Sequence, residues 1–122
     1  MKKIIPLFSL LFVSCYQQEC NCSDYRTGKF EFSQEINGVK ETTIFERAEK
    51  IQVETYKGKT DTASVRWIND CEFILQKINP KNRAEKQAIT MKILTTSENS
   101  YIFEYGIVGS ATKQRGTAKK IE

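Results

Sequence analysis

The chain has 122 residues, with 19 Lys and Arg against 15 Asp and Glu and a formal net charge of +4, which allows one domain and excludes a strongly basic nucleic-acid binder. Histidine is absent, which excludes the Ser-His-Asp and Cys-His catalytic arrangements and removes the commonest metal ligand. The sequence also has no glycine-rich phosphate loop and no G-x-S-x-G element. We therefore expect no catalytic residues, no cofactor and no enzyme activity.

The first 14 residues have the pattern of a bacterial secretory signal. Lys2 and Lys3 precede an apolar run over residues 4–13 that only Pro6 and Ser9 interrupt, and this run is too short to span a bilayer as a mature helix. The alternative is the first strand of a cytoplasmic domain, but the run does not alternate as a strand would. Export would place the cysteines in an oxidising compartment.

The motif "FVSC" ends the apolar run, with Ser14 directly before Cys15. It resembles a bacterial lipobox in the looser form of the Bacteroidetes, with Phe12 in place of leucine. The resemblance implies that Cys15 is lipidated and becomes the mature N-terminus, and that several acyl chains, at about 0.8 kcal/mol per buried methylene, hold the protein on a membrane. Cleavage without lipidation is the alternative. Residues 15–24 would form a lipidated tether and residues 25–122 the folded domain.

The remaining cysteines are expected to supply one disulfide. Cys20 and Cys22 are too close in sequence to pair without strain, so Cys71 takes one of them. We favour Cys22 because it adjoins the structured start "SDYRTGKF", whereas Cys20 lies in the tether. Cys20 is then a free thiol or an intermolecular partner. A three-cysteine metal site is disfavoured because histidine and a C-x2-C pair are absent, and we expect no metal.

Alternation of apolar and polar residues begins after Thr27 and indicates strands. The first four segments are 29–36, 39–48, 50–56 and 62–68, with Asn37-Gly38 as a strong hairpin signal between the first two and a turn at 57–61. The residues that share a side within these segments are Phe30 and Phe32, then Ile51, Val53 and Thr55, then Val65 and Trp67.

The same period continues in the second half of the chain. After a turn at Asn69-Asp70 come the segments 71–78, 87–96 and 101–108 and a weak last strand within 109–121. "NPKNRAE" at 79–85 is the one break long enough for a helical turn. The residues that share a side are Cys71, Phe73 and Leu75, then Ile89, Met91 and Ile93, then Tyr101, Phe103, Tyr105 and Ile107.

These segments make about eight strands with short connections, which favours an all-β fold of antiparallel neighbours. Eight strands in an up-and-down meander can close into a small barrel without leaving an edge. We therefore predict an eight-stranded meander barrel, with a flattened β-sandwich as the alternative.

The segments "CSDYRTGKF", "VRWINDCEFIL", "NPKN" and "SYIFEY" together resemble a family of small lipoproteins from flavobacteria and their relatives. The spacing of Cys22, Trp67, Asp70 and Cys71 is the most specific part. The resemblance implies an exported, lipid-anchored β domain and no established activity. Some members are labelled as a DNA topoisomerase IV subunit, a label that this short chain, with no nucleotide or DNA motif, does not support. The architecture also resembles a minimal calycin, a relative of the lipocalins.

Two groups of side chains are candidates for a site. Trp67 and the stripe Tyr101, Phe103 and Tyr105 form either core or the lining of a cavity for a small apolar ligand. The carboxylates Asp70 and Glu72 are either surface acids or the pair of a carboxylate-based envelope hydrolase.

The predicted function is that of a cell-envelope lipoprotein, a lipid-anchored binding or interaction module. The alternatives are a carrier of a small apolar ligand in the barrel interior and, less favoured, the hydrolase. The expected partners are a membrane, through the lipid, and an envelope protein or small apolar ligand, but no nucleic acid. We expect a monomer, on the outer membrane rather than the inner.

Overall fold

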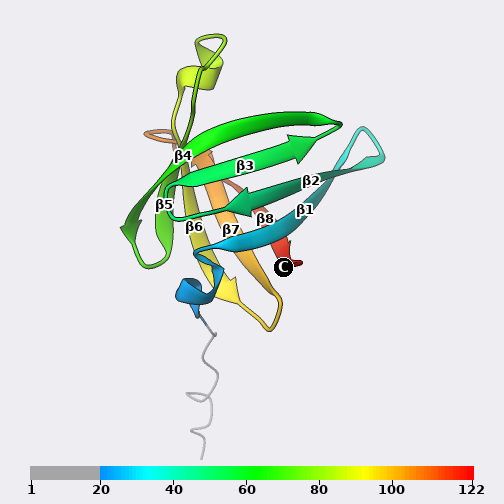
Figure 1. Cartoon of the computed structure of the whole chain (residues 1–122), viewed down its shortest axis with the longest axis vertical. Coiled ribbons are helices and arrows are strands. Elements are labelled where there is room, and N and C mark those ends of the chain that lie inside the picture. The colour runs from blue at the N-terminus through cyan, green and yellow to red at the C-terminus, as the bar shows by residue number, and fades with distance from the viewer. Residues whose placement is uncertain (1–19) are drawn as a thin grey trace, which may run out of the picture.

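A computed structural model describes residues 20–122, which form a closed barrel of eight antiparallel strands (Figure 1). Each strand pairs with the next, and β8 pairs with β1 to close the barrel. The strands are β1 (Gly28–Ile36), β2 (Val39–Arg47), β3 (Ile51–Tyr56), β4 (Lys59–Asn69), β5 (Glu72–Lys77), β6 (Ile89–Thr96), β7 (Ser100–Ile107) and β8 (Gln114–Lys120). The predicted meander barrel is thus confirmed, and the sandwich alternative is not the fold.

The predicted signal at 1–14 and the predicted lipidation site Cys15 lie outside the described residues. Within residues 20–122, no helix has the length and apolar character that crossing a bilayer requires.

Two hairpins owe their tightness to a pair of residues with positive φ. Asn37 and Gly38, between β1 and β2, have φ of 54° and 78°, and Lys57 and Gly58, between β3 and β4, have φ of 51° and 77°. Positive φ at both central positions is the type I′ geometry, whose twist matches that of the flanking strands. The Asn-Gly signal in the sequence therefore fixes the first register, in which Ile36 lies opposite Val39.

The meander gives the barrel two distinct ends (Figure 1). The short turns 48–50, 70–71 and 97–99 lie at one end together with the 3-10 turn η2 (Cys22–Tyr25). We call this the closed end, because η2 packs across it with Cys22 and Tyr25 each only 3% exposed. The open end carries the other loops, including residues 78–88. Their 3-10 turn η3 (Ala84–Lys86) overlaps the end of the segment 79–85 that is predicted to contain a helical turn.

The predicted Cys22–Cys71 disulfide is confirmed and ties η2 to the β4–β5 turn, with the two Cα atoms 5.2 Å apart. It spans 49 residues of sequence, and closing a loop of that length stabilises the fold by about 4 kcal/mol in the chain-entropy view. A small barrel gains much from such a link, because a domain of this size buries a modest share of its surface.

A buried arginine occupies the interior next to the closed end. Arg47 is 1% exposed. Its guanidinium donates to the backbone oxygens of Tyr25 (2.6 Å) and Arg26 (3.2 Å), to Gln52 Oε1 (3.0 Å) and to the Tyr101 hydroxyl (3.1 Å). Five rings lie 4.7 to 6.0 Å from its central carbon: Phe30, Phe45, Trp67, Phe73 and Tyr101. Burial raises the pKa of Tyr101 despite the opposing effect of Arg47, so this hydroxyl stays protonated.

The buried side of β3 is polar. Gln52 is 2% exposed and Glu54 faces the interior beside it, whereas Ile51 is 44% exposed on the outer side. The pairing of Arg47 with Gln52 in the β2–β3 register places the amide next to the guanidinium. Gln52 therefore faces inward because Arg47, which only donates hydrogen bonds, needs acceptors inside the barrel.

Replacing Arg47 tests this role. Arg47→Met keeps the length of the side chain but leaves four acceptors without their donor, and at about 1 kcal/mol for each lost hydrogen bond the unfolding free energy should fall by about 3 to 4 kcal/mol. Urea unfolding followed by Trp67 fluorescence measures it. Arg115→Met, on an exposed site of β8, should change the free energy by less than about 0.5 kcal/mol. Equal stability of the two variants would contradict the role assigned to Arg47.

Candidate binding site at the open end of the barrel

The interior is packed at the closed end and hollow at the open end. The hollow has a volume of about 310 Å³, at the lower end of the range for small-molecule sites. We call it the mouth hollow. Its apolar lining consists of Phe32, Phe45, Leu75, Ile89, Met91 and Phe103, and its polar lining of Gln34, Thr43, Gln52, Glu54 and Tyr105.

A second hollow of about 240 Å³ adjoins the first beneath the β5–β6 loop. The two share Glu54, Leu75 and Ile89 as lining residues. The loop above is held to β5 by a hydrogen bond of 2.9 Å from Gln76 Nε2 to the Lys86 carbonyl. Glu54 therefore lies where the two hollows meet, within reach of a molecule in either of them.

A hydrogen-bond relay connects Glu54 to the buried arginine. Arg47 Nη1 donates to Gln52 Oε1 at 3.0 Å, and Gln52 Nε2 donates to Glu54 Oε2 at 3.1 Å. A guanidinium can only donate and an ionised carboxylate can only accept, so the orientation of the Gln52 amide is fixed by its two neighbours. Gln52 therefore bridges the Arg47 guanidinium and the Glu54 carboxylate by hydrogen bonds.

The environment of Glu54 opposes its ionisation. Burial is the main cause that raises the pKa of its carboxyl, the hydrogen bond from Gln52 opposes the rise, Asp61 adds to it and Lys77 lowers it. Arg47 carries its charge on the far side of Gln52, and no ion pair among residues 20–122 joins it to Glu54. A donor group of a ligand at this carboxylate would favour the ionised form.

At the rim of the open end, the ammonium group of Lys77 lies between two carboxylates. Lys77 Nζ lies 3.5 Å from Asp61 and 3.4 Å from Glu85. Burial alone would lower the pKa of Lys77, but the two carboxylates together raise it. Next to Glu54 the carboxylates of Asp61 and Glu85 thus lie near a single ammonium group. The loops farther out at this end carry basic side chains as well, among them Lys81, Arg83, Lys86 and Lys113. The inward carboxylate of Glu54, rather than the charge of the whole rim, therefore favours a ligand with a cationic or hydrogen-bond-donating group.

The four predicted ligand-binding aromatics divide between the two ends. Phe103 and Tyr105 line the mouth hollow, and the Tyr105 hydroxyl donates to Gln114 Oε1 at 2.9 Å. Trp67 and Tyr101 lie instead around Arg47 at the closed end. The sequence analysis did not single out Glu54. In a strand whose apolar residues alternate with polar ones, the glutamate after Val53 is expected to face solvent.

The carboxylates Asp70 and Glu72 lie at the closed end, far along the barrel from the mouth. Asp70 is exposed in the β4–β5 turn, and Glu72 accepts a hydrogen bond of 3.0 Å from Asn69 Nδ2. Neither lines the mouth hollow, so they form no acidic pair within it.

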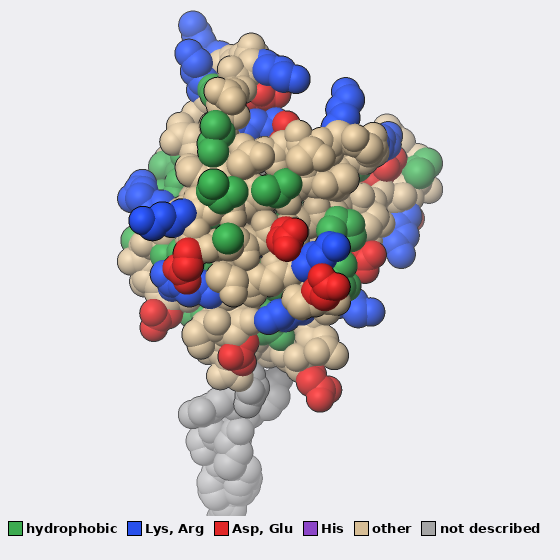
Figure 2. All heavy atoms as spheres, viewed as in Figure 1, with side chains coloured by type: hydrophobic (Ala, Val, Ile, Leu, Met, Phe, Trp, Pro, Cys, Tyr) green, Lys and Arg blue, Asp and Glu red, His purple; other side chains and the backbone are tan. Residues whose placement is uncertain are grey.

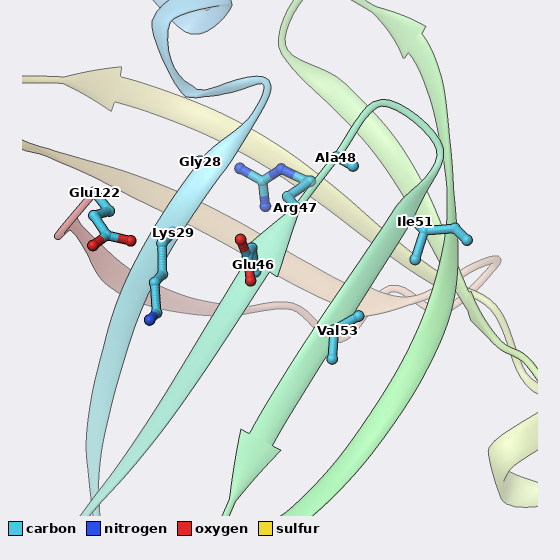
Figure 3. A pocket seen from close by; sticks show the side chains of 8 residues that line it. All are labelled: Gly28, Lys29, Glu46, Arg47, Ala48, Ile51, Val53 and Glu122. Carbon is cyan, nitrogen blue, oxygen red and sulfur yellow. The ribbon is translucent and has the colours of Figure 1, made fainter.

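Two further hollows lie on the outer surface. One of about 460 Å³ lies over β1, β2 and β3, with Lys29, Glu46 and Glu122 toward one side and Ile51 and Val53 of β3 toward the other (Figure 3). The other, of about 490 Å³, lies over β4 beside Trp67, whose indole Nε1 is buried without a hydrogen-bond partner. Acidic and basic side chains are mixed over the face that Figure 2 shows. The mouth hollow differs from both because it is lined by the inward sides of several strands.

Comparison with known proteins gives no further guide to this site, because no family model, curated protein or solved structure matches the chain. The assignment of the mouth as the candidate site rests on three features of its geometry. These are its concave apolar wall, its single inward carboxylate and its position opposite the closed end.

Substitution of Glu54 should show the cost of its burial. Its raised pKa means that the folded state holds the proton more tightly than the unfolded state. The protonated carboxyl therefore adds to the unfolding free energy. This contribution is fully present below the ordinary glutamate pKa and is lost as the pH rises through the raised pKa of the folded state. Glu54→Gln should therefore raise the unfolding free energy relative to wild type at neutral pH, and this gain should shrink at about pH 4.

Urea unfolding at the two pH values measures the difference. Glu98→Gln, on the exposed β6–β7 turn, is the matched control and should show no such change. A gain from Glu54→Gln that is the same at both pH values would show that ionisation is not its cause.

Proposed function

We propose that this chain is a lipid-anchored protein of the bacterial cell envelope whose barrel binds a small, mainly apolar molecule in the mouth hollow. The observation that carries the proposal is a barrel interior that is packed at one end and hollow at the other. A barrel with a purely structural role gains stability by filling its interior, since each void costs packing energy. A hollow lined by aromatic and aliphatic side chains with one carboxylate has the character of a ligand site.

The position of the first described residues agrees with an anchor that leaves the mouth free. The turn η2 lies at the closed end (Figure 1), and Cys20 lies there beside Cys22 and Cys71. A lipid on Cys15 would be only five residues from Cys20, which is at most about 18 Å of extended chain. The closed end would then face the membrane and the mouth would face away from it. A ligand could enter the mouth from the aqueous side without detaching the protein.

The chemistry of the mouth favours an amine with a short apolar body. The apolar wall contributes burial energy of roughly 25 cal/mol per Å² of ligand surface removed from water. The relay occupies one oxygen of the Glu54 carboxylate, since Gln52 donates to Oε2. An ammonium group at the other carboxylate oxygen would gain a charge-assisted hydrogen bond.

Lipidation can be tested by metabolic labelling with an alkyne-bearing fatty acid. The wild-type protein should incorporate the label and partition into detergent. Cys15→Ser should lose the label entirely, whereas Cys20→Ser should keep it, because only a cysteine directly after the cleaved bond is acylated. An unlabelled wild type whose N-terminus is a free Cys15 would contradict the anchor.

Ligand binding can be measured on a soluble form without leader or lipid, because residues 20–122 contain the complete barrel. Native mass spectrometry of material from the natural host should first show whether a small molecule is retained. Calorimetric titration with hexylamine, hexanol and hexanoate then separates the apolar from the polar contribution. The amine should bind most tightly, and Glu54→Gln should weaken it by about ten- to a hundredfold, the range for a hydrogen bond to a charged group.

The same substitution should leave hexanol affinity nearly unchanged, because the apolar wall is intact. Glu98→Gln should change neither affinity. If the three probes bind the wild type equally, the role of Glu54 is wrong, and if none binds and no molecule is retained, the ligand site itself is wrong.

A further inference from the structure

Three sulfur atoms meet at the closed end of the barrel. Cys20 is exposed and unpaired, and its Sγ lies 3.3 Å from Cys22 Sγ and 3.7 Å from Cys71 Sγ. The other two sulfurs form the disulfide. The free thiol therefore lies beside the disulfide and almost equally close to both of its atoms. We call these three residues the sulfur cluster.

The backbone around the cluster holds it in place from two sides. On the Cys20 side, the Asn21 amide donates to Thr96 Oγ1 on β6 at 2.8 Å. On the Cys71 side, the Cys71 amide donates to Asn69 Oδ1 at 2.9 Å, and its carbonyl accepts from the amide of Ile93 at 2.8 Å. Residues of β4 and β6 thus hold the backbone on both sides of the cluster. The closeness of the thiol to the disulfide follows from the fold and not from a freely moving tail.

We propose that the sulfur cluster is a thiol–disulfide exchange site, in which the Cys22–Cys71 and Cys20–Cys71 pairings interconvert. The Cys20 thiolate attacks Cys71 Sγ, a Cys20–Cys71 bond forms and the Cys22–Cys71 bond breaks. Cys22 leaves as a thiolate and takes up the proton that Cys20 lost. The step conserves electrons and needs no external oxidant or reductant.

The required movement is small. A disulfide bond is about 2.05 Å long, so Cys20 Sγ must approach Cys71 Sγ by only about 1.7 Å from its present distance. The attacking sulfur must also turn into line with the bond that breaks, which an exposed residue ahead of the first packed element can do. Attack on Cys22 instead would give a disulfide between two residues that are separated by one residue, a strained ring.

Exchange would change what the protein presents to its surroundings. In the pairing seen here the free thiol is on exposed Cys20, whereas after exchange it would be on Cys22, the first residue of η2, which is 3% exposed. A buried neutral thiol behaves as a small apolar side chain. The site would therefore alternate between a form that can react with a thiol or disulfide of another molecule and a form that cannot. This inference is independent of the ligand in the mouth.

Alkylation followed by tandem mass spectrometry tests exchange on the full chain isolated from membranes. Samples are held at about pH 4, where thiols are protonated, shifted to about pH 8.5 for increasing times, and trapped with N-ethylmaleimide. The label should begin on Cys20 and then appear on Cys22 within about an hour, within the range for disulfide reshuffling. A tenth or more of the label on Cys22 corresponds to a gap between the pairings of about 1.4 kcal/mol or less.

Two controls make the result decisive. Protein unfolded in guanidinium chloride should spread the label among Cys20, Cys22 and Cys71, which shows that the method detects scrambling. Cys20→Ser should carry no label on Cys22 or Cys71 in the folded state, because the attacking thiol is gone. If the folded wild type keeps all of its label on Cys20 while the unfolded sample scrambles, the exchange site is wrong.

Discussion

The burial of Arg47 is the interaction on which the interior of this barrel depends. Removing a guanidinium from water costs several kcal/mol unless its donors are satisfied. Here no carboxylate among residues 20–122 forms an ion pair with it. The backbone oxygens of Tyr25, the last residue of η2, and of Arg26 accept its hydrogen bonds instead, together with one amide and one hydroxyl. The segment that closes the barrel is therefore the same segment that stabilises its buried cation.

This arrangement explains why the two ends differ. Aromatic rings surround Arg47, so the closed end is packed. The Gln52 amide, which accepts from Arg47, donates a hydrogen bond to Glu54 in the mouth. Beyond this layer the interior has room for Phe32 and Phe103 only because β8 carries a glycine between them. A Cβ on Gly116 would lie 2.5 Å from Phe32 Cε1 and 2.9 Å from Phe103 Cζ. The mouth hollow thus begins on the open-end side of Arg47 and the aromatic rings that surround it.

The two proposed activities lie at opposite ends and use different chemistry. The mouth offers an apolar wall and one carboxylate, whereas the closed end offers a thiol beside a disulfide. A lipid on Cys15 would keep the sulfur cluster close to the membrane surface and the mouth away from it, because the intervening chain is short. The strands between them pair into a closed barrel, and no residue lines both sites.

Local patterns in the sequence were sufficient for the strands and the tightest turns. Asn37-Gly38 sets its own hairpin through positive φ, and the alternation of Tyr101, Phe103 and Tyr105 is a property of one strand that any pairing preserves. The sequence favoured the Cys22–Cys71 pairing but left Cys20 as the alternative partner of Cys71, and the structure decided between them. The strands and turns depend on neighbouring residues, whose pattern can be seen in the sequence.

Only the tertiary structure decided which side of β3 faces inward and which aromatics line a hollow. By hydrophobicity alone Ile51 and Val53 would be buried, yet Gln52 and Glu54 face the interior because Arg47, on the adjacent strand, requires an acceptor there. The closeness of Cys20 to the disulfide likewise depends on contacts with β6, more than 70 residues away in sequence. A polar side chain is buried when a distant partner satisfies it, and that partner is known only once the strands have paired.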